Sequence, residues 1–203
     1  MKKTLIILLL FTLIGCERAY IKDFKIEGIG IGDSLLDYFT EKQIAEGMLE
    51  MEEFNLTKDG NFREFIAAEF RFENFENYDV LQIYFKPNDK RYEIYGISGI
   101  IEYQDINNCY LKQNEIVEEF SVTFKNSEKY ELSYPNSNDE TDNSMIKRIS
   151  FLLKSGSSAL VSCYDWSDDF IKKGLANNIE WVKHLRISIN EKERSEYLME
   201  VSL

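Results

Sequence analysis

Residues 78–85 read Tyr-Asp-Val-Leu-Gln-Ile-Tyr-Phe, and this stretch decides the fold because its side chains alternate in character. Every second residue from Leu81 to Phe85 is apolar and shares one face, whereas Val80, Gln82 and Tyr84 share the other. Strict alternation predicts a β-strand with one face in the core. The stretch therefore indicates a sheet.

A turn and a second strand follow directly. Residues 86–90 read Lys-Pro-Asn-Asp-Lys, and Pro87 suits a turn because its φ is fixed. Residues 92–103 predict a long returning strand, in which Gly96 and Gly99 indicate a bulge, a bend or close packing. Further strands are predicted over residues 62–72, 125–134, 145–153, 159–164 and 181–189.

Helices are predicted before, between and after these strands. Residues 105–124 form the clearest one, because six side chains recur on one face at helical spacing: Cys109, Gln113, Ile116, Val117, Phe120 and Phe124. Residues 34–49 predict two short helices that meet at Thr40, which begins a capping box. A last helix is predicted over residues 191–199, and residues 165–178 are predicted as a loop with at most one helical turn.

The order of these elements predicts an α+β fold, an antiparallel sheet with helices packed on one face. It also allows two tandem helix-plus-meander units, with lobes over residues 26–104 and 105–203 of a domain spanning 26–203.

The N-terminus has the layout of an export signal. Lys2 and Lys3 precede the apolar run Leu5–Ile14, which is shorter than the roughly 17–25 residues that span a bilayer. Leu13-Ile14-Gly15-Cys16 resembles the lipobox of bacterial lipoproteins. The resemblance implies cleavage of residues 1–15, a lipid on Cys16 and a tether over residues 16–25. An ordinary signal peptide and a buried N-terminal helix are the alternatives.

Two later motifs carry a second resemblance. At Gly32–Phe39 and again at Cys163–Ser167 the chain is similar to a group of small uncharacterised bacterial lipoproteins, which implies no known activity. In element order it resembles, more loosely, the small lipoproteins of outer-membrane assembly and the beta-lactamase inhibitor proteins. Those folds bind proteins through an open sheet face, although fold analogy does not fix function.

Charge and cysteine content narrow the partners. Without residues 1–15 the chain has 22 basic and 36 acidic residues, a net charge of −14. This charge disfavours binding to the phosphates of nucleic acid. It also disfavours contact with anionic lipid, so the lipid on Cys16 is expected to be the membrane contact. An exported chain meets an oxidising compartment, so Cys109 and Cys163 are predicted to form a disulfide, with two separately buried thiols as the alternative.

Few residues suggest catalysis. His184 is the single histidine and lies in an alternating strand, so we expect it to pack on the sheet, and no metal or cofactor is expected. Asp165 and Asp168 flank Trp166 and suggest either a carboxylate hydrolase or a capped turn. The acidic residues around Asp139 lack calcium-loop spacing and are expected in a solvated loop.

Aromatic residues give the remaining functional hint, because tyrosine is enriched where proteins bind proteins. The candidates for a binding surface are Tyr84, Tyr92, Tyr95, Tyr103 and Trp166. Packing beneath helices is the alternative. The sequence thus favours a lipid-anchored, non-catalytic module that binds an envelope protein or component on the periplasmic face of the cell membrane or outer membrane. An envelope hydrolase near Asp165 and a small-ligand carrier are the alternatives.

Overall fold

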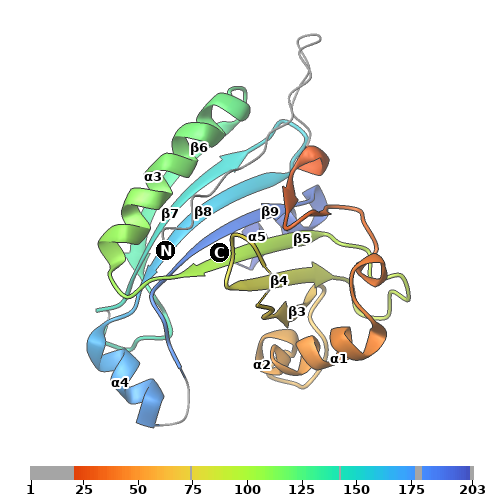
Figure 1. The fold of residues 1–203 in the computed structure, drawn as a ribbon, viewed down its shortest axis with the longest axis horizontal. Helices are drawn as coiled ribbons and strands as arrows, with labels where there is room; N and C mark the ends of the chain where they lie inside the picture. Colours follow the sequence, from red (N-terminus) through yellow and green to blue (C-terminus); the bar gives the residue numbers. More distant parts are fainter. Residues whose placement is uncertain (1–20, 74, 142, 177–179, 202–203) are drawn as a thin grey trace.

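The computed structural model describes residues 21–73, 75–141, 143–176 and 180–201 (Figure 1). Its helices are the 3-10 helices η1 (Ile21–Asp23) and η2 (Leu35–Asp37), followed by α1 (Glu41–Leu49), α2 (Glu52–Asn55), α3 (Ile106–Thr123), α4 (Asp168–Ala176) and α5 (Lys192–Glu200). Its strands are β1 (Lys25–Ile26), β2 (Ile29–Gly30), β3 (Ile66–Phe70), β4 (Val80–Phe85), β5 (Gly96–Glu102), β6 (Glu128–Pro135), β7 (Met145–Leu152), β8 (Ser158–Asp165) and β9 (His184–Asn190).

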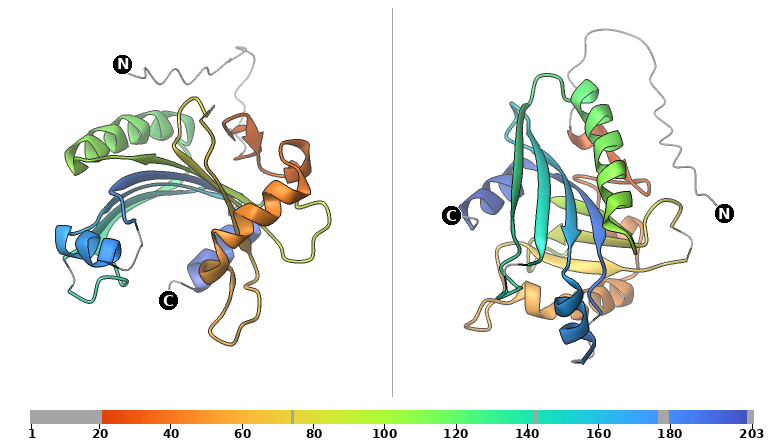
Figure 2. Two further views of the ribbon diagram at one scale, coloured as in Figure 1. Left: turned by 60° about the horizontal axis from the view of Figure 1, so that its bottom comes forward. Right: turned by 90° about the vertical axis from the view of Figure 1, so that its left-hand side faces the viewer.

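Seven of the strands form one antiparallel sheet in the order β3-β4-β5-β9-β8-β7-β6, which confirms the predicted α+β class. The last strand, β9, lies between β5 and β8 and pairs with both. The two lobes that the element order allowed therefore share a single sheet. Figure 2 shows the strands as one strongly curved layer, with α3 on one side and α5 on the other.

Alternation divides the sheet into two faces. The apolar face, as we call it, carries Ile83 of β4, Ile97 of β5, Val161 of β8 and Leu185 of β9, all of which are fully buried. The helix α3 lies against β8 and β9 on this face. Full burial of one such side chain contributes about 1.5–3 kcal/mol to folding.

The predicted helix over 105–124 is confirmed as α3. Asp105 caps it, since its carboxylate accepts from the backbone N–H of Asn107 at 3.0 Å. Cys109, Ile116 and Phe120 are buried where α3 meets the sheet. The apolar stripe read from the sequence is therefore the surface that α3 buries.

Cys109 of α3 and Cys163 of β8 lie at disulfide-bonding distance, with Sγ atoms 2.01 Å apart and Cα atoms 6.0 Å apart. Both residues are fully buried. The pairing predicted from the sequence therefore joins the long helix to the centre of the sheet.

The segment that leads into the sheet also packs on the apolar face. Ile21 is buried, and the ring of Phe24 lies 4.7 Å from that of Phe124. These contacts place part of the tether expected over residues 16–25 in the folded body. Cys16 itself lies outside the described residues.

Several elements differ from the sequence prediction, and two of the differences have a clear cause. The strand expected from Tyr92 begins only at Gly96, because Tyr92 has a positive φ of 48° and its N–H donates to Asp89 O within the preceding turn. The loop expected over 165–178 contains α4, whose Phe170 stacks on Trp166. The ring of Phe170 also packs against Trp181 at 5.3 Å, and Ser167 at the start of α4 donates to Asp139, so contacts with residues outside the helix hold it in place.

The first helices follow the prediction closely. Thr40 caps α1 with a complete capping box, in which Gln43 N–H donates to Thr40 Oγ1 and Gln43 Oε1 accepts from Thr40 N–H.

Among the described residues, none of the helices has the length and apolar character needed to cross a bilayer.

Candidate functional site

The side of the sheet opposite α3 is rich in polar residues, and we call it the polar face. Strand register sets its rows: His184 of β9 lies between Glu102 of β5 and Tyr164 of β8, and Arg186 lies between Ile100 and Ser162. Because side chains alternate along a strand, these residues project away from α3. The polar face thus follows from the same alternation that builds the core.

A continuous set of hydrogen bonds crosses this face from β4 to β5. Tyr84 Oη donates to Gln82 Oε1 at 3.0 Å, and Gln82 Nε2 donates to Glu69 Oε2 at 2.8 Å. The guanidinium of Arg71 then bridges Glu69 at 3.0 Å and Glu102 at 2.9 Å. Each carboxylate is therefore paired, and the network fixes the positions of its members.

A cleft of about 250 Å³ opens beside this network. Its walls come from β3, β4, β5, β9 and the segments on either side of α4. The residues that line it are Glu69, Arg71, Gln82, Ile100, Glu102, Trp166, Glu180, Trp181, Val182, His184 and Arg186. A water molecule occupies about 30 Å³ in the liquid, so the cleft has room for about eight waters or for one small molecule.

Arg186 is the unusual charge in the cleft. Its side chain is half-buried, its Nε has no hydrogen-bond partner, and none of the described carboxylates forms an ion pair with it. Its guanidinium carbon lies 5.3 Å from the centre of the Tyr164 ring, a cation–π contact. A guanidinium stays charged in proteins, so Arg186 keeps a positive charge that the carboxylate of Glu69 influences at a distance but does not pair with.

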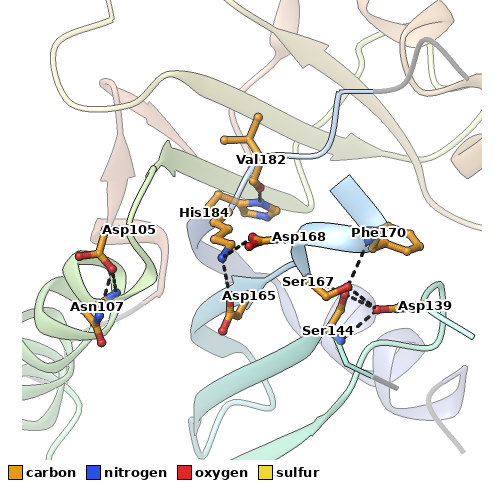
Figure 3. Close-up of polar contacts among 11 residues, drawn as sticks. Asp105, Asn107, Asp139, Ser144, Asp165, Ser167, Asp168, Phe170, Val182 and His184 are labelled. Carbon is orange, nitrogen blue, oxygen red and sulfur yellow. Dashed lines mark hydrogen bonds and ion pairs between the residues drawn. The ribbon is translucent and has the colours of Figure 1, made fainter. Parts of the chain in front are cut away.

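His184 lies next to Arg186 and is held neutral. Burial, reinforced by the charge of Arg186, lowers its pKa to about 3. Its Nδ1 lies 2.8 Å from Val182 O (Figure 3), and its ring stacks on Tyr164 at 4.5 Å. A carbonyl oxygen only accepts, so Nδ1 carries the proton, and the unpartnered Nε2 is an acceptor.

Trp166 completes the group of unpartnered atoms. The indole is buried, stacks on Phe170 at 5.2 Å and packs against Trp181 at 4.6 Å, yet its Nε1–H has no acceptor. The cleft therefore joins two unpartnered donors, on Arg186 and Trp166, to one unpartnered acceptor on His184. Unsatisfied buried polar groups are few in folded proteins, and the concentration of three of them here makes the cleft the candidate site.

The carboxylates suggested for hydrolysis lie outside this cleft. Lys183 Nζ is 3.3 Å from Asp165 and 3.6 Å from Asp168, so one ammonium pairs with both (Figure 3). The Asp168 side chain is 81% exposed. Neither carboxylate lines the cleft, and the arrangement resembles the capped turn more than a pair of catalytic acids.

Asp139 departs from the solvated loop expected around it. Its side chain is buried and accepts hydrogen bonds from Ser144 and Ser167, which Figure 3 shows, and from Thr141. The hydroxyl of Ser144 at 2.6 Å is the strongest cause that keeps the pKa of Asp139 well below its usual range. Asp139 therefore ties its loop to the start of α4.

The five predicted aromatic residues do not form one surface. Tyr84 is buried on the polar face beside the cleft, Tyr92 packs against Phe85 in the core, Tyr95 packs against Phe65, Tyr103 is half-buried against the core, and Trp166 lines the cleft. Tertiary packing thus uses most of them beneath other elements, and only Trp166 belongs to the site.

Sequence reasoning missed the charged residues of the cleft, above all Arg186. Its signal was an arginine within an apolar alternating strand, flanked by Leu185 and Ile187. No group of three metal-ligating side chains occurs among the residues the structure describes. Comparison with protein-family models, curated proteins and solved structures gave no match.

Proposed function

We propose that this chain is a non-catalytic, lipid-anchored binding protein of the cell envelope, and that it binds its ligand in the cleft on the polar face. The observation that supports the binding role is the group of unpartnered polar atoms on Arg186, His184 and Trp166. The lipid anchor rests on the resemblance of Leu13–Cys16 to a lipobox.

Binding in the cleft is favoured over hydrolysis by the pairing of its charges. Glu69 and Glu102 are both held by Arg71, and the neutral ring of His184 does not share a hydrogen bond with a nucleophile. General acid–base catalysis needs a proton-transferring group positioned toward a reacting atom. The same residues are well placed to recognise a polar ligand.

The anchor is tested by growing bacteria that express the full chain with an alkyne-bearing fatty acid. The wild-type protein is expected to carry the label and to sediment with membranes, and Cys16→Ala is expected to lose both properties. A labelled Cys16→Ala protein contradicts lipidation at this residue.

The binding role is tested by thermal unfolding of the detergent-purified full chain with the low-mass fraction of an envelope hydrolysate. A raised midpoint is expected for wild type and for Tyr130→Ala, an exposed residue outside the cleft, but not for Trp181→Ala. Mass spectra of the fraction should not change during incubation. Consumption of a component would support the hydrolase alternative instead.

A further inference from the structure

The chemistry of the cleft restricts its ligand, provided that the binding role proposed above holds. The unpartnered donors on Arg186 and Trp166 need an acceptor, and the unpartnered acceptor on His184 needs a donor. A ligand that satisfies all three therefore carries an acceptor group and a hydrogen-bond donor close together.

The ion pairs of the cleft, and not its net charge, restrict the number of negative charges on that ligand. Arg71 is shared by Glu69 and Glu102, whereas Arg186 has no carboxylate within ion-pairing distance in the described part of the chain. These side chains sum to zero, and Glu180 at the exposed rim adds one negative charge. One anionic group can pair with Arg186, whereas a doubly charged group would be repelled by the neighbouring carboxylates.

The shape of the guanidinium selects the type of anion. Arginine presents parallel N–H groups that match the two oxygens of a planar carboxylate. The half-buried ring of Trp181 at the same cleft offers an apolar wall for the body of a ring-shaped molecule.

We propose that the cleft binds a small monocarboxylate that also carries a hydroxyl group, of the size of a sugar acid. Arg186 pairs with the carboxylate, the indole N–H of Trp166 donates to it, and the hydroxyl donates to Nε2 of His184. Arg186, Trp166 and His184 line the cleft, but the three unpartnered nitrogens are themselves buried, so binding requires small shifts of the side chains around them.

The test is calorimetric titration of the full chain, purified in detergent, with D-glucuronate, D-glucose and inorganic phosphate. We expect D-glucuronate to bind at least ~10-fold more tightly than D-glucose, which lacks the carboxylate, and more tightly than phosphate. Equal binding of glucose, tighter binding of phosphate, or no binding of glucuronate at millimolar concentration would overturn the proposal.

Two variants locate the carboxylate. Arg186→Met is expected to weaken glucuronate binding at least ~10-fold, and Arg186→Lys, which keeps the charge but loses the planar fork, is expected to weaken it less. Arg148→Met is the matched control, since Arg148 lies on the same face beside Ser162 but outside the cleft, and it should bind as wild type does. Unchanged binding by Arg186→Met would refute the assignment.

The two proposals fail separately. If glucuronate does not bind but the envelope hydrolysate still raises the unfolding midpoint in a Trp181-dependent way, the cleft is a binding site for a different ligand class. If the hydrolysate also has no effect, the binding role itself is wrong.

Discussion

Leu185 and Arg186 are adjacent in β9 but lie in opposite environments. Leu185 is fully buried on the apolar face beneath α3, and Arg186 lies half-buried in the cleft on the polar face. Leu185 lies between the apolar side chains of Ile101 and Cys163, and their burial stabilises the folded state. The charge of Arg186, in contrast, is held near the interior without a carboxylate in an ion pair. The apolar face therefore stabilises the folded protein, whereas the polar face holds polar groups that lack an intramolecular partner.

The helices sharpen this contrast. On the apolar face, α3 is bonded to β8 by the disulfide and buries an apolar stripe. On the polar face, α5 packs Tyr197 against Phe65 and also makes a contact through a charge: the guanidinium of Arg194 lies 3.5 Å above the Tyr84 ring, and burial lowers its pKa to about 10. The polar face is thus covered at one end by a cation–π contact and is open at the cleft.

Removal of the disulfide should give the largest effect. Replacing Cys109 and Cys163 together with alanine is expected to lower the free energy of unfolding by about 4 kcal/mol, because the bond closes a loop of 54 residues in the unfolded chain. Urea unfolding measures the loss, and the intact mass after alkylation, with and without reductant, verifies the bond in wild type. Free thiols in oxidised protein would contradict the pairing.

The β9 neighbours provide a direct comparison of the faces. Leu185→Ala should cost about 3 kcal/mol by leaving a cavity under α3, whereas Arg186→Met should change stability by less than about 1 kcal/mol or raise it. Denaturant unfolding of both variants measures the difference. Equal losses would show that Arg186 is a structural residue, which the proposed binding role does not allow.

The polar face should also make stability depend on pH through His184. Its pKa is about 3 when folded and near 6.5 when unfolded, so the unfolded state binds the proton first as pH falls. Stability is fully present above pH 6.5 and declines toward pH 3, by at most about 1.4 kcal/mol per pH unit.

Thermal unfolding across this range should show a flatter profile for His184→Gln. The groups that face the ring are Arg186, Arg71, Glu102 and Tyr164. Carboxylates of an unfolded chain titrate near pH 4, so the contribution of His184 is measured between about pH 5 and 6.5, where the histidine alone titrates. Asp139, whose folded pKa is depressed, adds its loss only below about pH 4. An unchanged slope in His184→Gln would contradict the neutral, buried ring.

A buried pair of hydroxyls gives the smallest expected effect. Ser98 Oγ and Ser188 Oγ lie 2.7 Å apart on the polar face. Ser188→Ala should cost about 1 kcal/mol because it leaves one hydroxyl unsatisfied, and adding Ser98→Ala should recover most of the loss. A double-mutant cycle by urea unfolding measures this coupling, and additive losses would show that the two hydroxyls do not interact.

Much of the fold could be predicted because its signals are local. Alternation at 78–85 specified both faces of β4, helical spacing specified α3, and the Thr40 capping box specified the start of α1. The helix α4 was missed because the contacts of Phe170 with Trp181 and of Ser167 with Asp139 form only in the folded chain. The candidate site was largely missed for the same reason, since only Trp166 among the predicted surface residues lines the cleft.

Periodicity along the chain was enough to predict the α+β class and most of the strands, and two remaining thiols made the pairing of Cys109 with Cys163 the favoured prediction, because these signals do not depend on distant neighbours. Only the tertiary structure decided that β9 inserts between β5 and β8. That placement sets His184 beside Glu102 and Arg186 beside Ile100 of β5, in a cleft that Trp166 also lines. The physical reason is that strand order follows from which apolar surfaces bury one another, and no single stretch of sequence contains that information.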